Sequence, residues 1–107
     1  MDVLHAIAER RTIRKFLDIP VEEDKLGTIL EAGTLAPSAG NLQNWKFIVV
    51  RSEKRAAIAE AAAQQLWMAE APVLIVICAE MRRIRQFYGK RGDSYAAQNC
   101  AAAAENM

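Results

Sequence analysis

Residues 35–50 read LAPSAGNLQNWKFIVV, and this stretch joins a polar loop directly to a strand. The run KFIVVR at residues 46–51 is apolar and β-branched, which predicts a mostly buried strand. The residues before it are turn formers, so we expect a loop from Ser38 to Asn44. Short amide and hydroxyl groups therefore stand at the mouth of the predicted core, where a two-residue turn would have been enough.

Two helices are predicted ahead of this loop. Residues 2–10 carry apolar side chains at helical spacing, which is typical of a short amphipathic helix. Residues 21–36 follow Pro20 with a second apolar stripe, and three acidic residues stand at the positive end of the helix dipole. We expect Pro37 to end this second helix.

The chain beyond residue 51 predicts a helix, a strand and a last helix. Ser52 is expected to cap a helix over about residues 53–68. APVLIVICAE at residues 71–80 predicts a strand that lies centrally in its sheet with helices covering it, because it is apolar on both faces. The basic, glycine-containing residues 81–93 predict an exposed excursion, and Ser94 would open the last helix.

The last helix looks interrupted, since it has neither a glycine cap nor a basic final turn. Two strands alone make a poor sheet, so further strands are expected from missing sequence or from another chain.

Composition places the chain among soluble globular proteins, as one domain over residues 1–107. Its 107 residues are 52% apolar and 25% charged, with a formal net charge of +1. This balance gives no overall attraction to nucleic acid or to an anionic membrane, and no apolar run reaches the roughly 20 residues that span a bilayer. The amphipathic N-terminus does not resemble a secretory signal, so we expect a cytoplasmic protein with reduced, buried Cys78 and Cys100.

A basic segment and the polar loop are the two candidate sites. The basic segment combines guanidinium groups with a hydroxyl, which suits a phosphate, although a solvated basic edge is the interpretation that residue types alone favour. It consists of Arg10, Arg11, Thr12, Arg14 and Lys15. Arg10 and Arg14 would share one face if the first helix continued. The loop's Ser38, Asn41, Gln43 and Asn44 could bind a flat heterocycle, whereas composition alone favours an ordinary loop.

No side chain is an obvious acid, nucleophile or metal ligand. His5, the only histidine, is expected on the surface of the first helix, and the two cysteines lack metal-binding spacing. Trp45 is expected in the core, and the other aromatic residues are expected mostly in the core or at an interface.

Four segments taken together resemble the nitroreductase family of FMN-dependent oxidoreductases. They are ERRTIRKF at residues 9–16, APSAGNLQNWKFIVV at 36–50, APVLIVICAE at 71–80 and YAAQNCAAAAEN at 95–106. The resemblance implies an α+β fold, an α/β/α sandwich whose central mixed sheet is covered by helices, here incomplete at the C-terminus. It also implies a homodimer with the flavin at the interface.

The resemblance implies a role for each candidate site. Arg10, Arg11, Thr12 and Arg14 would hold the FMN phosphate and ribityl chain. The loop residues near the isoalloxazine ring would be Pro37, Ser38, Ala39, Asn41 and Gln43. Phe87 and Tyr88 would lie where the family commonly has a lid over the flavin. Thr12 replaces the usual serine, and Asn44 stands in place of a proline, which is expected to loosen the loop.

The implied activity passes a hydride from NADH or NADPH through FMN to a small acceptor such as a nitroaromatic or a quinone. Such chemistry needs no catalytic side chain, because the cofactor supplies it. Two alternatives stay open at this point. One is a non-catalytic remnant that binds flavin or dimerises, and the other is a small helical module that binds an acidic partner through residues 10–15 and 82–91.

Overall fold

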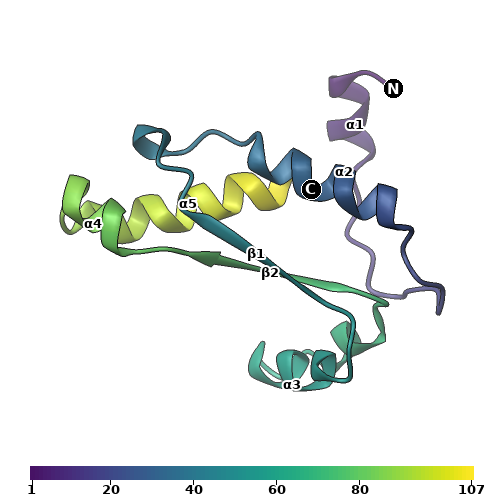
Figure 1. Ribbon diagram of the computed structural model, residues 1–107. Helices are drawn as coiled ribbons and strands as arrows, with labels where there is room; N and C mark the ends of the chain where they lie inside the picture. Colours follow the sequence, from purple (N-terminus) through teal and green to yellow (C-terminus); the bar gives the residue numbers. More distant parts are fainter.

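The computed structural model describes residues 1–107, and its centre is a two-stranded antiparallel sheet (Figure 1). β1 spans Trp45–Val50 and β2 spans Leu74–Ala79. The register runs from Trp45 opposite Ala79 to Val50 opposite Leu74. Both predicted strands are confirmed, the first shifted by one residue.

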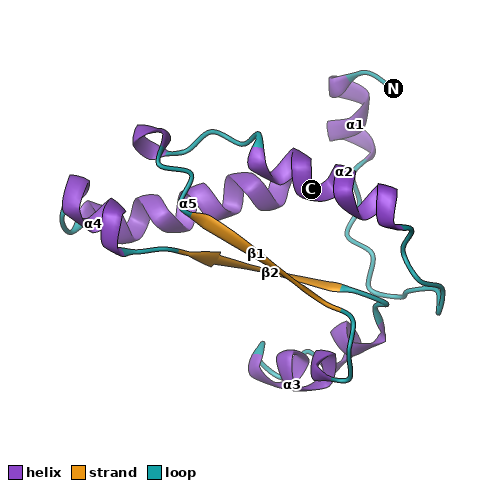
Figure 2. Ribbon diagram, in the orientation of Figure 1, coloured by secondary structure: helices purple, strands orange, loops and turns teal.

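Two helices cover one face of this sheet (Figure 2). α5 spans Arg91–Asn106, and α2 spans Glu23–Thr34, which confirms the predicted second helix. α5 can lie close to its neighbours because three of its four buried residues, Gly92, Ala96 and Ala103, are small; the fourth is Asn99. The end of α5 is fastened to α2, since Asn106 Nδ2 donates a hydrogen bond to the Ala32 carbonyl at 3.1 Å.

The buried core is small. Only 12 of the 107 residues are buried, and the core cluster consists of Leu42, Ile84 and Ala96. All six residues of β2 are half-buried, and Ile48, on the sheet face away from α2, is 46% exposed. Within this chain β2 pairs with β1 alone and helices cover one face, so its central position in a sheet stays a prediction that depends on further strands.

The predicted helix over residues 53–68 is broken. α3 spans only Lys54–Ala61, and a short 3-10 helix, η2, follows at Leu66–Glu70. Between them Ala63 and Gln64 adopt the left-handed conformation, at φ 57° and 59°. This reversal lets the chain return antiparallel to β1. The N-cap of α3 is Glu53, which makes no side-chain capping bond, so the expectation that Ser52 caps the helix is wrong by one residue. Ser52 precedes the cap, and its Oγ accepts the Lys54 N–H at 3.3 Å.

The predicted excursion at residues 81–93 is largely helical. α4 spans Arg82–Tyr88, and α5 begins at Arg91 instead of Ser94. Two features of α4 explain the difference. The Glu80 carboxylate accepts the first backbone N–H groups of α4, and Ile84 on its inner face is fully buried. Gly89, at φ 58°, ends the helix in a conformation that favours glycine.

The first helix lies exposed at the edge of the molecule. α1 spans Val3–Glu9 and is capped by Asp2, whose Oδ1 accepts the His5 N–H at 2.8 Å. The apolar residues Val3 and Leu4 are 74% and 80% exposed, and His5 is exposed as predicted. α1 ends before Arg10, so the arginines that follow do not share a helical face. None of the helices combines the length and the apolar character needed to cross a membrane.

Candidate functional site

The predicted flavin loop forms one wall of a groove against α5. The groove has a volume of about 360 Å³. It is lined by Pro37, Ser38, Ala39, Tyr95, Gln98, Asn99 and Ala102. Three of the five loop residues proposed from sequence therefore line one open groove, whose opposite wall comes from a helix some sixty residues further along the chain.

The loop has an unusual backbone. Gly40, Asn41 and Gln43 all adopt left-handed conformations, at φ 59°, 53° and 49°. The turn is fixed by Ser38, whose Oγ accepts the Gln43 N–H at 3.0 Å and whose carbonyl accepts the Asn41 N–H at 3.0 Å. Leu42 points into the core, whereas the side chains of Asn41 and Gln43 are exposed outside the groove. Asn41 and Gln43 are held in a sparsely populated backbone region, so the hydrogen bonds of Ser38 must offset the free-energy cost of this turn.

Two buried asparagines hold the loop against α5 and the sheet. Asn99 Oδ1 accepts the Ala39 N–H, and Asn99 Nδ2 donates to Asn44 Oδ1, both at 2.9 Å. Asn44 Nδ2 in turn donates to the Glu80 carbonyl at 2.9 Å, and the Glu80 N–H donates to the Asn44 carbonyl at 2.7 Å. Both side chains are 4% exposed. We call this chain of hydrogen bonds, from Ala39 through Asn99 and Asn44 to Glu80, the asparagine relay. Because each of these polar groups has a hydrogen-bond partner, the relay fixes the position of the loop.

The expectation that Asn44 loosens the loop is therefore wrong. A proline at this position could not make the side-chain amide hydrogen bonds that join the loop to Glu80, just after β2, and to Asn99 of α5. Sequence reasoning also missed Asn99. No sequence signal marked it, because the alanine-rich last helix carries three amides, Gln98, Asn99 and Asn106, and only the packing shows that Asn99 is the buried one.

Tyrosines connect the loop to α4. A Cβ atom built on Gly40 would lie 2.7 Å from the Tyr88 hydroxyl, so the absence of a side chain lets that hydroxyl approach the loop. Tyr88 also meets Tyr95, which lines the groove, edge to face at 4.9 Å between ring centroids. Phe87 next to it is 73% exposed. α4 therefore stands directly beside the groove.

The N-terminal basic segment lies elsewhere. Arg10, Arg11, Thr12 and Arg14 are all exposed. Figure 1 places the segment after α1 on one side of the molecule and the loop before β1, beside α4, on the other. One chain thus does not bring its arginines to its own loop.

The arginines of this segment form no ion pair with any acidic residue. Arg11 Nη1 instead donates to the carbonyls of Ala8 and Arg10, each at 2.8 Å. Arg10 Nη1 reaches Thr12 Oγ1 at 3.4 Å. Arg14 lies over the Trp67 ring at 5.7 Å, and this cation–π contact positions its guanidinium while leaving the charge unneutralised. Unpaired guanidiniums beside a hydroxyl fit a phosphate group.

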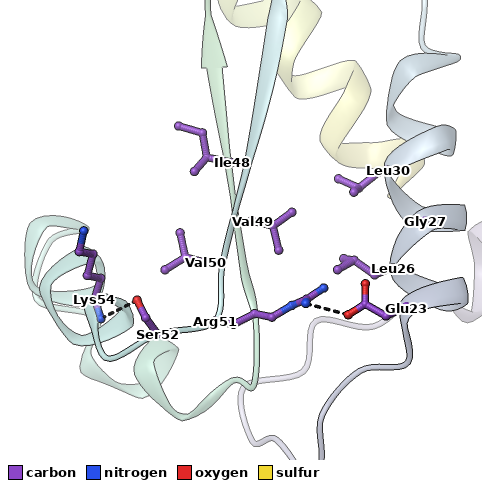
Figure 3. A pocket seen from close by; sticks show the side chains of 10 residues that line it. All are labelled: Glu23, Leu26, Gly27, Leu30, Ile48, Val49, Val50, Arg51, Ser52 and Lys54. Atoms are coloured by element: carbon purple, nitrogen blue, oxygen red, sulfur yellow. Dashed lines mark hydrogen bonds and ion pairs between the residues drawn. The ribbon is translucent and has the colours of Figure 1, made fainter.

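The largest cavity, about 700 Å³, opens between α2 and β1 (Figure 3). Figure 3 shows Val49 facing Leu26 and Leu30 of α2, while the neighbouring Ile48 points away. The only ion pair there joins Arg51 to Glu23 at 2.7 Å. None of the site residues predicted from sequence lines this cavity.

Neither a metal centre nor a reactive thiol emerges from the structure. No three His, Cys, Asp or Glu side chains converge. Cys78 and Cys100 are free and only half-buried, as is Trp45, so the expected core positions are only partly reached. Burial raises the pKa of the Cys100 thiol, and the nearby Cys78 raises it further, which keeps Cys100 protonated.

A model of the nitroreductase family matches residues 7–67 of the sequence. This chain belongs to the nitroreductase family. The match covers both the basic segment and the polar loop, and it agrees with the resemblance inferred from the motifs.

Two curated relatives and one solved structure illustrate the similarity of this nitroreductase-family chain. An NADH dehydrogenase of Thermus thermophilus is 44% identical over 82 residues, covering 76% of this chain and 40% of that protein. An FMN reductase [NAD(P)H] of Bacillus subtilis is 35% identical over 85 residues, covering 78% and 34%. The NADPH:FMN oxidoreductase of Vibrio harveyi, solved with NAD+, superposes with a TM-score of 0.82 at 26% identity, covering 96% and 48%.

The chain thus spans about half or less of the length of these proteins. The superposition confirms the expected α+β nitroreductase fold, of which this chain has five α-helices and one antiparallel strand pair.

Proposed function

We propose that this nitroreductase-family chain is part of an FMN-dependent oxidoreductase that takes electrons from NADH or NADPH. The observation that carries the proposal is the rigid loop with its groove, together with a separate set of unpaired arginines. Similar proteins named as an FMN reductase and an NADPH:FMN oxidoreductase support the choice of FMN and NAD(P)H.

The residues present fit FMN in two parts. Arg10, Arg11, Thr12 and Arg14 would hold the phosphate, because their guanidiniums are free of ion pairs. At the other part, Pro37, Ser38 and Ala39 of the groove wall, with the exposed amides of Asn41 and Gln43, would contact the ring system. When bound, FMN supplies the electron-transfer chemistry between NAD(P)H and a small acceptor, such as a nitroaromatic or a quinone.

We further propose that the site is completed between two copies of the chain. Each copy keeps its arginines and its loop apart, and a two-fold pair lets the arginines of one copy meet the loop of the other. The apolar face of α1 supports this arrangement. Val3, Leu4 and Ile7 are all at least two-thirds exposed, and a second copy would cover them.

Chain mixing tests the shared site directly. One variant carries Arg10→Ala and Arg14→Ala, and the other carries Asn41→Ala and Gln43→Ala. Each variant alone should hold little FMN after purification. Unfolding and refolding them together should restore about a quarter of the sites, because random two-fold pairing gives one intact site in each mixed pair.

The activity is tested separately on the unaltered protein. It should purify with a flavin absorption spectrum that bleaches on addition of NADPH or NADH. Bound flavin that NAD(P)H cannot reduce would refute the oxidoreductase, and a mixture of variants that stays colourless would refute the shared site.

A further inference from the structure

A second basic cluster lies beside the groove and has no role in the function proposed so far. Five basic and two acidic residues occur between Glu80 and Asp93, whereas the rest of the chain has nine basic and eleven acidic residues. The positive charge of this protein is therefore concentrated in and around α4. Such a local concentration can attract an anion even though the net charge of the chain is only +1.

Most of these cations have no partner. Arg85 is the exception, since its Nε donates to Asp93 Oδ1 at 2.7 Å. Glu80 is occupied as well, because its carboxylate accepts two backbone N–H groups of α4. The cations left without an ion pair are Arg82, Arg83, Lys90 and Arg91, and all four are exposed. We call these four residues the α4 cluster.

An exposed aromatic ring lies among these charges. Phe87 is 73% exposed and follows Arg83 by four residues, so the two share one face of α4. A solvated basic edge would explain the cations but gives no reason for the ring. A flat aromatic group carrying phosphates would use both, by stacking on the ring and pairing with the charges.

The α4 cluster lies beside the predicted flavin loop, and this position favours the dinucleotide electron donor as the ligand. Tyr88, next to Phe87 in sequence, contacts both the loop and Tyr95 of the groove wall. If the flavin ring lies along the loop, the nicotinamide of the electron donor must reach it there. The adenosine and phosphates of the donor then extend over the neighbouring surface, which includes α4.

We propose that the α4 cluster binds the phosphate groups of NAD(P)H and that Phe87 stacks on its adenine. This inference rests on the proposed function, because it places the donor relative to the flavin. It concerns residues other than those assigned to FMN. It also gives a role to residues 82–91, which one of the sequence-based alternatives assigned to binding an acidic partner.

The test uses a triple variant, Arg83→Gln, Lys90→Gln and Arg91→Gln, in the full protein. The matched control removes three exposed lysines elsewhere, with Lys25→Gln, Lys46→Gln and Lys54→Gln, so that both proteins lose three positive charges. Calorimetry measures binding of adenosine 2′,5′-bisphosphate, NADP+ and NAD+ to each protein at low salt, and absorbance measures the bound flavin separately. None of the contacts proposed for the bisphosphate involves the flavin, so this probe reports on the cluster whether or not FMN is present.

We expect the triple variant to bind the bisphosphate at least about tenfold more weakly than the control, the scale of one lost charged hydrogen bond. Its affinity should also depend less on salt. Weakening of NADP+ alone would assign the cluster to the 2′-phosphate, and weakening of both dinucleotides would assign it to the bridging diphosphate. Phe87→Ser should weaken all three probes several-fold.

Equal affinities in the triple variant and the control would overturn the donor site while leaving flavin binding intact. Absence of flavin from the unaltered protein would instead refute the proposed function. Probe affinity therefore tests the donor site, and bound flavin separately tests the proposed function.

Discussion

Replacing Asn99 with alanine should destabilise the protein far more than its place in an alanine-rich helix suggests. The change removes two hydrogen bonds of 2.9 Å, one from the Ala39 N–H and one to Asn44 Oδ1. Asn44 is 4% exposed, so its oxygen cannot recover a bond to water without rearrangement. Each buried group left unpaired costs about 1 to 3 kcal/mol, and Ala39 is only half-buried, so we expect a total loss of about 2 to 4 kcal/mol.

Urea unfolding followed by circular dichroism measures this loss, with Gln98→Ala as the matched control. Gln98 is exposed on the same helix, and its only side-chain hydrogen bond, at 3.3 Å, goes to Ser94. The control should lose less than about 0.5 kcal/mol. Amide exchange at Ala39 should also accelerate in Asn99→Ala and stay unchanged in the control.

A second substitution separates the two hydrogen bonds. Asn99→Asp keeps an acceptor for Ala39 but places an oxygen against Asn44 Oδ1, so it should destabilise at least as much as alanine does. Similar unfolding free energies for Asn99→Ala and Gln98→Ala would refute the reasoning that the asparagine relay holds the loop.

Three further predictions follow from the structure. Arg14→Ala should weaken FMN binding by about 1.5 to 3 kcal/mol in a fluorescence titration, and unchanged affinity would contradict the phosphate assignment. Gly92→Ala should destabilise the protein by about 1 to 3 kcal/mol in urea unfolding, because the new Cβ would lie 2.9 Å from the Ile84 carbonyl oxygen. Gly27→Ala is the control and should stabilise the protein slightly, since its new Cβ would have no neighbouring atom within 4 Å. Backbone N–H groups at the start of α4 lower the pKa of Glu80, so its carboxylate stabilises the fold above about pH 4.5, and this stabilisation is lost as the pH falls further. Glu80→Gln should therefore make the unfolding free energy depend less on pH in the acid range. An unchanged pH dependence in the variant would contradict this role of Glu80.

Local patterns predicted the elements whose cause is local. The β-branched run at residues 46–51 predicted β1 to within one residue, and the acidic start of residues 21–36 predicted α2. The break after α3 had no such signal, because alanine and glutamine are good helix formers and nothing marks Ala63 and Gln64 as left-handed. The tertiary need to reverse the chain toward β2 overrode that propensity.

In the candidate site, too, sequence predicted the features with a local cause and missed those that depend on long-range contacts. Residue types and spacing identified the loop, since its turn formers are contiguous in sequence. The partner of the loop could not be read in this way, because Asn99 is 55 residues from Asn44 and its role depends on the packing of α5. The asparagine in place of a proline was misjudged for the same reason, because only a long-range contact shows what its amide binds.

The left-handed turn at Gly40, Asn41 and Gln43 has a consequence for affinity. The free-energy cost of the left-handed backbone is offset when the protein folds, and the hydrogen bond to Asn99 of α5 holds the turn in this conformation before any ligand binds. A ligand that docks on the turn therefore loses little affinity to ordering the chain, and its dissociation constant should reflect the contacts themselves.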